Sequence, residues 1–206
     1  MENHPKAIHD YVAGKIHALR NREDPYVRAS LAKLRRGIGK PPGSMPDIWD
    51  LTLGGLPEAF LSKTHEPTPG EWAAYLSLTL FALHQQGKSL RDDPMSMADN
   101  TKPDKSLGHA VLILTAKRGP DAKDAIKRRF DVVVTSDSPE ELAYHLRGII
   151  NLLRSEGIPL DYPRLAEDLY RFQTPALRDG VRLRWAQDYT IVRGKDEENN
   201  ENQAIC

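Results

Sequence analysis

The chain has 206 residues, of which 39% are hydrophobic and 28% are charged, a balance typical of a globular protein. Lys and Arg together number 29, as do Asp and Glu, so the net charge is zero and only its local distribution can indicate a partner. The single cysteine, Cys206, excludes a disulfide framework within the chain. The polar opening MENHPKAIHD predicts no secretory signal, and no apolar run approaches the roughly 18 residues of a membrane span. We therefore expect a cytoplasmic chain without a membrane partner.

The N-terminal part is expected to form two helices. Apolar residues at helical spacing predict the first, and Asp24-Pro25 predicts the start of the second, which is expected to run to about Arg36. The first stripe comprises Ile8, Tyr11, Val12, Ile16 and Leu19.

Two further helices are expected to begin with a capping box in which proline takes the first helical position. These boxes are Thr68-Pro69-Gly70-Glu71 and Ser138-Pro139-Glu140-Glu141, where the hydroxyl accepts from a free backbone N–H and the glutamate reaches back. Each box precedes an amphipathic stripe. The two stripes are Trp72, Tyr75, Leu76, Leu80 and Leu83, and Leu142, Leu146, Ile149, Ile150 and Leu153.

The sequence as a whole predicts an all-α fold of eight or nine helices without a sheet. The most strand-like run, Val132-Val133-Val134, is short and continues the helical stripe of Ile126 and Phe130. Residues 88–105 lack periodicity and contain two prolines, which predicts a polar loop between two small helical bundles, residues 1–90 and 105–190. The acidic residues 194–206 are expected to form a disordered tail.

Positive charge is concentrated in two segments. Residues 15–40 hold eight basic residues against two acidic ones, and residues 117–129 hold six against two. In the first segment, helical geometry places Arg28 and Arg35 together, with Arg36 beside them, and Gly37 and Gly39 could let backbone amides approach a phosphate. The segment contains no interleaved aromatic residue, so backbone binding is expected without base stacking. The candidate phosphate-binding residues are Arg28, Lys33, Arg35, Arg36, Lys40, Lys117, Arg118, Lys127, Arg128 and Arg129.

Motifs for catalysis or metal binding are not found in the sequence. None of the seven histidines belongs to an H-E-x-x-H motif, and C-x-x-C, G-x-S-x-G and the P-loop spacing are missing. We therefore expect no catalytic residues, no metal site and no cofactor.

Several segments, taken in order, resemble the CasB family, the small subunit of the type I-E CRISPR surveillance complex Cascade. Together they cover most of residues 28–173, and their order is more specific than any one of them. They are Leu34-Arg35-Arg36-Gly37 with Trp49, Trp72-Ala73-Ala74-Tyr75, Ser106-Leu107-Gly108-His109-Ala110, Lys127-Arg128-Arg129-Phe130, His145-Leu146-Arg147, Ile158-Pro159-Leu160-Asp161-Tyr162 and Leu165-Ala166-Glu167-Asp168-Leu169.

The resemblance implies two small helical bundles and a non-catalytic role. It implies a pair of copies along a filament of crRNA-bound backbone subunits, with the large subunit as a further partner. The basic surface would hold target DNA, mainly the displaced non-target strand, and so stabilise the R-loop. By position, Arg35, Arg36, Arg128, Arg129 and Arg147 match basic residues of the family. His109 stands where the family often has arginine, so a contact there would be weaker or absent, and the acidic tail lies outside the family core.

Two other functions fit the same helices. One is a helical protein–protein adaptor or regulator without direct nucleic-acid contact, in which Arg35 and Arg36 pair with acidic protein surfaces. The other is a sequence-specific helix-turn-helix regulator, which is disfavoured because no compact recognition unit is evident.

Overall fold

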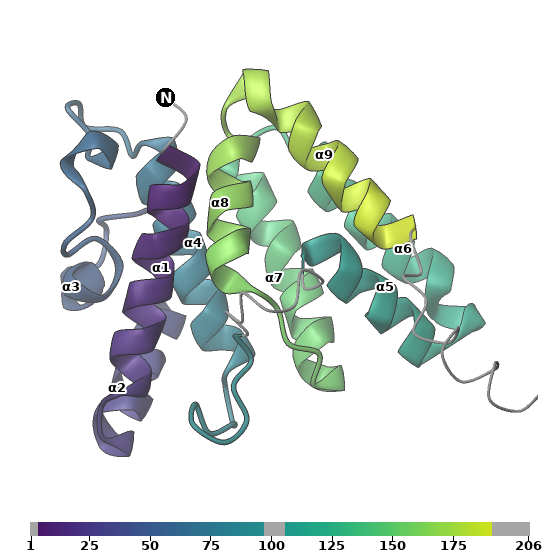
Figure 1. The fold of residues 1–206 in the computed structure, drawn as a ribbon, viewed down its shortest axis with the longest axis horizontal. Coiled ribbons are helices and arrows are strands. Elements are labelled where there is room, and N and C mark those ends of the chain that lie inside the picture. The colour runs from purple at the N-terminus through teal and green to yellow at the C-terminus, as the bar shows by residue number, and fades with distance from the viewer. Residues whose placement is uncertain (1–3, 97–105, 191–206) are drawn as a thin grey trace, which may run out of the picture.

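The computed structural model describes residues 4–96 and 106–190, and within these ranges the chain forms helices and no strand. The predicted all-α fold is confirmed (Figure 1). Two 3₁₀ turns, Pro46–Ile48 and Glu58–Phe60, lie in the connection between α2 and α4. The helices are α1 (His4–Arg20), α2 (Asp24–Arg36), α3 (Trp49–Thr52), α4 (Pro69–His84), α5 (Leu107–Arg118), α6 (Pro120–Thr135), α7 (Pro139–Glu156), α8 (Tyr162–Phe172) and α9 (Pro175–Thr190).

One of the two predicted capping boxes forms in full. At the start of α4, Thr68 Oγ1 accepts from the Glu71 amide at 3.1 Å, and Glu71 Oε2 accepts from the Thr68 amide at 2.8 Å. At the start of α7, Ser138 Oγ accepts from the Glu141 amide at 3.1 Å. The prediction of a second box is wrong in one respect, because Glu141 Oε2 accepts from the Asp137 amide instead. Both helices therefore begin at the predicted proline with a side-chain cap.

Helix α4 is the centre of the molecule. Every residue from Gly70 to His84 is buried, and α1, α2, α7 and α8 pack around the helix. The predicted stripe from Trp72 to Leu83 is therefore only part of its buried surface. Most of the remaining positions are small or apolar, as in Ala73, Ala74 and Leu78, and these residues let helices pack on all sides.

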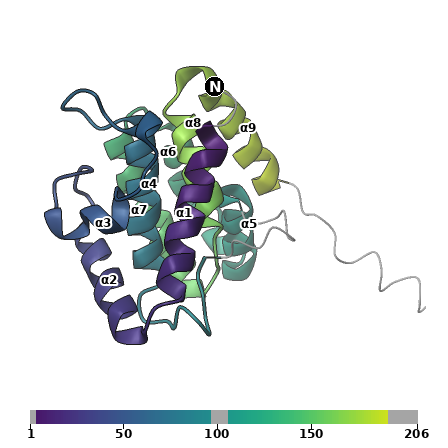
Figure 2. The same ribbon diagram turned by 60° about the vertical axis from the view of Figure 1, so that its left-hand side comes forward.

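The two predicted bundles are in extensive contact. Helix α8, which follows α7 in the chain, packs against α1 and α4, and Figures 1 and 2 both show α1 and α8 side by side. The buried apolar residues of both parts form a contiguous cluster. Residues 88–96 form the beginning of the predicted polar loop, whereas 97–105 and the predicted tail 194–206 lie outside the described residues. The division into two bundles stays a prediction.

Close packing of α5 on α9 depends on Gly108. A Cβ added at this position would lie inside van der Waals distance of the Trp185 carbonyl oxygen, which belongs to the backbone and cannot rotate away. We expect Gly108→Ala to lower the free energy of unfolding by about 1–3 kcal/mol, the usual cost of overpacking. Urea denaturation followed by circular dichroism measures this change.

Gly14 provides the matched control for Gly108. It lies within α1, and a Cβ there would have no heavy atom within 4 Å. Gly14→Ala should therefore leave stability unchanged or raise it by up to about 1 kcal/mol, because alanine favours the helix. Equal stability of the two variants would contradict the packing role assigned to Gly108.

Within the described ranges, no helix is both long enough and apolar enough to span a bilayer. The same residues contain no cluster of three His, Cys, Asp or Glu side chains placed to hold a metal ion.

Candidate nucleic-acid interface

Three arginines from two helices line one groove, here called the α6–α7 groove. Arg128 and Arg129 come from α6 and Arg147 from α7, and the cavity between them has a volume of about 580 Å³. Among the described residues that line it, none carries a carboxylate. The arginines therefore produce a locally positive potential despite the zero net charge of the chain. The remaining lining residues are Val132, Tyr144, His145, Gly148 and Asn151.

The glycine-containing loop after α2 lies next to this groove. A second cavity of about 310 Å³, here called the loop–α7 cavity, is lined by the loop residues Ile38 to Pro41 and by α4 and α7. Tyr144 and Arg147 line both cavities, so Lys40 lies near the α6–α7 groove. Glu140 is the acidic residue on the wall of the loop–α7 cavity. The structure thus brings together four of the predicted residues, Lys40, Arg128, Arg129 and Arg147.

Arg28 and Arg35 line a separate cavity of about 470 Å³, here called the α2 groove. Their predicted placement on one side of α2 is therefore confirmed. The Arg35 Nη1 donates to the Ala82 carbonyl at 3.4 Å, at the end of α4. Burial and the nearby charge of Arg154 lower the pKa of Arg35, although an arginine remains charged at neutral pH. Arg20, Lys88 and Arg91 also line the α2 groove, together with the acidic residue Asp24.

Arg36 and Lys33 do not join these grooves. The Arg36 guanidinium forms an ion pair with Asp47, which lies within the 3₁₀ turn Pro46–Ile48. Lys33 is exposed and lines none of the three cavities. Phosphate binding by either residue stays a prediction, and for Arg36 it would have to replace the Asp47 carboxylate.

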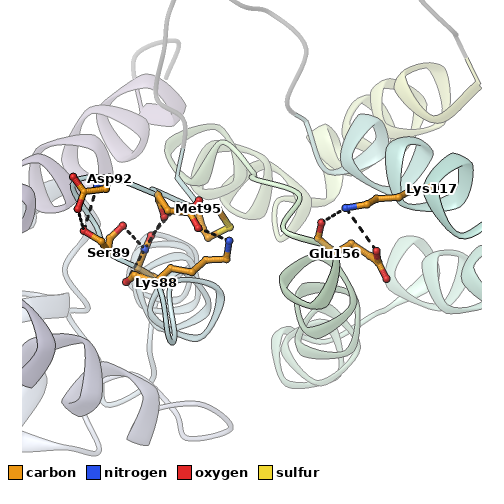
Figure 3. A network of polar contacts seen from close by, with 8 residues as sticks. Lys88, Ser89, Asp92, Met95, Lys117 and Glu156 are labelled. Carbon is orange, nitrogen blue, oxygen red and sulfur yellow. Dashed lines mark hydrogen bonds and ion pairs between the residues drawn. The ribbon is translucent and has the colours of Figure 1, made fainter.

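Carboxylates of the same chain offset the positive charge of three other predicted residues. The Lys117 amine points towards Glu156 in Figure 3. Its Nζ lies 3.7 Å from Glu156 Oε2. Arg118 Nε lies 2.9 Å from Glu156 Oε1, and Lys127 Nζ lies 2.7 Å from Asp131 Oδ2, one helical turn away. Exposed pairs of this kind contribute only about 0–1 kcal/mol to stability. They nevertheless reduce the local positive charge, which makes these residues weaker candidates for phosphate binding than the arginines of the α6–α7 groove.

Sequence reasoning missed Arg154 and Tyr144, both on α7. Arg154 follows Arg147 by two helical turns, so helical spacing alone could have placed both on one face. Its Nη1 donates to Gln86 Oε1 at 2.5 Å, and its charge acts on Arg35. Asn151 lies between the two arginines in the sequence and also lines the α6–α7 groove. This face of α7 therefore extends from the α6–α7 groove towards Arg35.

A family model described as CRISPR-associated protein Cse2 matches residues 30–189, the part of the chain that contains the α6–α7 groove. The chain belongs to the Cse2 family. Arg28 lies just before the matched range, whereas Arg35, Lys40, Arg128, Arg129 and Arg147 lie within it.

Three crystal structures resemble this Cse2-family chain over most of their length. CasB from Thermobifida fusca is 32% identical, with a TM-score of 0.71 over 90% of this chain and 98% of that protein. A Cse2-family protein from Thermus thermophilus is 23% identical, with a TM-score of 0.61 over 88% and 96%. CasB from M. ruber is 24% identical, with a TM-score of 0.62 over 85% and 90%.

The predicted resemblance to CasB is thus confirmed by both the family model and the T. fusca structure. The other two structures support the fold of the Cse2-family chain. No curated protein has a sequence that matches this chain.

Proposed function

We propose that this Cse2-family chain is a non-catalytic small subunit of a CRISPR Cascade complex and binds the backbone of the displaced non-target DNA strand. The observation that carries this proposal is the α6–α7 groove, where three arginines line one cavity and none of its described lining residues is acidic. Arginine binds phosphate well because its planar guanidinium can donate two parallel hydrogen bonds.

Binding of this kind would stabilise the R-loop. Exchange of a DNA duplex for an RNA–DNA heteroduplex is nearly balanced in free energy, so contacts to strand backbones can shift the equilibrium. Base pairing with the guide supplies the sequence specificity, so the subunit needs only to bind phosphates. Its partners would be the backbone and large subunits, a second copy of itself, the crRNA and the target DNA.

Replacement of Arg128, Arg129 and Arg147 by alanine tests the proposal. Each phosphate contact on a single strand contributes about −0.7 to the slope of log affinity against log salt concentration. The triple variant should therefore bind single-stranded DNA more weakly, with a slope flatter by about 2 units. Its melting temperature should barely change, since all three side chains are exposed and exposed charges contribute little to stability.

Lys117, Arg118 and Lys127 provide a control that removes the same number of positive charges. Because carboxylates already offset the positive charge of these residues, their triple alanine variant should keep most of the wild-type salt dependence of DNA binding. Fluorescence anisotropy of a labelled single strand at several salt concentrations compares the three proteins. Equal slopes for both variants would contradict a role for the groove. Unchanged DNA binding together with failed assembly of the complex would favour the protein–protein adaptor.

A further inference from the structure

Tyr144 is the most exposed of the large hydrophobic side chains in the described ranges, with 73% of its surface accessible. A single exposed aromatic residue is common on protein surfaces and by itself indicates nothing. Tyr144 differs in its position, because it lies on α7 and lines both the α6–α7 groove and the loop–α7 cavity.

The charged side chains around Tyr144 are mainly cationic. Arg147 lines the same two cavities, with Arg128 and Arg129 in one of them and Lys40 in the other. Glu140 supplies the single carboxylate among the described residues that line the two cavities. The excess of positive charge favours a polyanion as the molecule that covers the tyrosine ring.

The ring of Tyr144 also has room for a ligand. His145 is its one aromatic neighbour among the described residues and approaches edge-on, with 5.1 Å between ring centroids and an interplanar angle of 80°. This contact supports the ring while most of the side chain stays in solvent. An exposed aromatic ring between cations is the arrangement by which proteins hold single strands, with bases stacked on rings and phosphates near basic side chains.

We propose that Tyr144 stacks on an unpaired nucleobase of the strand whose phosphates bind in the α6–α7 groove. This inference rests on the proposed function and adds a contact that the basic segment 28–40, with no interleaved aromatic residue, does not provide. Stacking accepts any base because every base has a π-face. The same tyrosine can therefore stack on the displaced strand of any target DNA, whatever its sequence.

Two single strands of equal length and charge isolate the stacking contact. One is oligothymidylate and the other is its abasic counterpart, and the full chain is titrated with each at low salt. Wild type should bind the base-bearing strand more tightly. Tyr144→Ala should reduce that preference by at least about fivefold, the lower end of the loss from one stacked base. Tyr144→Phe should retain the preference, and the affinity for the abasic strand should be the same in all three proteins.

Tyr26→Ala is the matched control, because Tyr26 is half exposed on α2 and lines neither cavity. This variant should keep the wild-type preference. If the ratio of affinities for the base-bearing and abasic strands is the same in Tyr144→Ala as in wild type, stacking is refuted and phosphate binding stands. Equal weakening of both strands by Tyr144→Ala would also refute stacking, because the residue would then act on the groove itself. If wild type binds neither strand at low salt, the proposed function fails and this inference fails with it.

Discussion

Replacement of Asp168 by alanine is expected to lower the free energy of unfolding by about 3–5 kcal/mol, the usual effect of removing one partner of a buried ion pair. Asp168 lies on α8 with 1% of its surface exposed. It accepts a hydrogen bond from Trp185 Nε1 at 2.7 Å and forms an ion pair with Arg184, both on α9. Its loss would leave a partly buried guanidinium and a buried indole N–H without their acceptor.

Asp179 on α9 provides the matched control for Asp168. It also pairs with an arginine, Arg182, at 3.4 Å, but 92% of its side chain is exposed. Asp179→Ala should therefore change stability by less than about 1 kcal/mol. Urea denaturation of both variants at pH 7 measures the difference. If both variants unfolded at the same urea concentration, the buried pair would contribute no more than a surface pair, contrary to this prediction.

The second expected result is a loss of stability through His84 as the pH falls from about 6.5 to about 4. His84 is fully buried at the end of α4, with Nδ1 3.0 Å from the Tyr162 hydroxyl. Burial, followed by the charges of Lys88 and Arg154, lowers the pKa of His84 to about 4. Within this window the unfolded chain binds a proton and the folded chain does not, so acid favours unfolding by up to about 3 kcal/mol.

Asp168 acts in the opposite direction over a similar range. Burial raises its pKa to about 6, although Arg184 and the Trp185 hydrogen bond act to lower it. As the pH falls from about 6 towards the ordinary value of 3.8, the folded state takes up this proton first and gains stability. The two buried groups therefore offset each other in the wild-type protein.

Two variants separate these opposed contributions. The stability of wild type minus that of His84→Gln should fall by about 3 kcal/mol between pH 7 and pH 4. The stability of wild type minus that of Asp168→Asn should instead rise as the pH falls over this range. Denaturation curves at several pH values give both differences, and groups that titrate equally in wild type and variant cancel. A His84→Gln difference independent of pH would contradict the lowered pKa.

The fold was largely predictable because its signals are local. Proline after Thr68 and Ser138 indicated where α4 and α7 begin, since both the cap and the missing N–H act within one turn. The burial of α4 from Gly70 to His84 was less evident, although Ala73, Ala74 and Leu78 outside the predicted stripe were already small or apolar. What surrounds a helix depends on tertiary packing, which local patterns do not encode.

The candidate site was predictable only in part, because charge depends on neighbours that are remote in sequence. Counting charges along residues 117–129 grouped Arg118 with Arg128 and Arg129, but Glu156, which offsets Arg118, lies 38 residues away from it. Tyr144 lies near Arg128 and Arg129 only because α6 and α7 pack together. The positions of Arg128 and Arg129 were predicted, whereas the groove that distinguishes them from their paired neighbours needed the structure.

The central position of α4 has a consequence for synthesis on the ribosome. The helix has no polar face, and two of the helices that cover it, α7 and α8, are translated after it. At roughly 5–20 residues per second, a nascent chain that has released α4 waits several seconds for α8. During this interval the apolar surface that α7 and α8 will cover is open to chaperones and to other nascent chains. Slow translation of the second half would therefore prolong the stage at which this chain is most prone to aggregate.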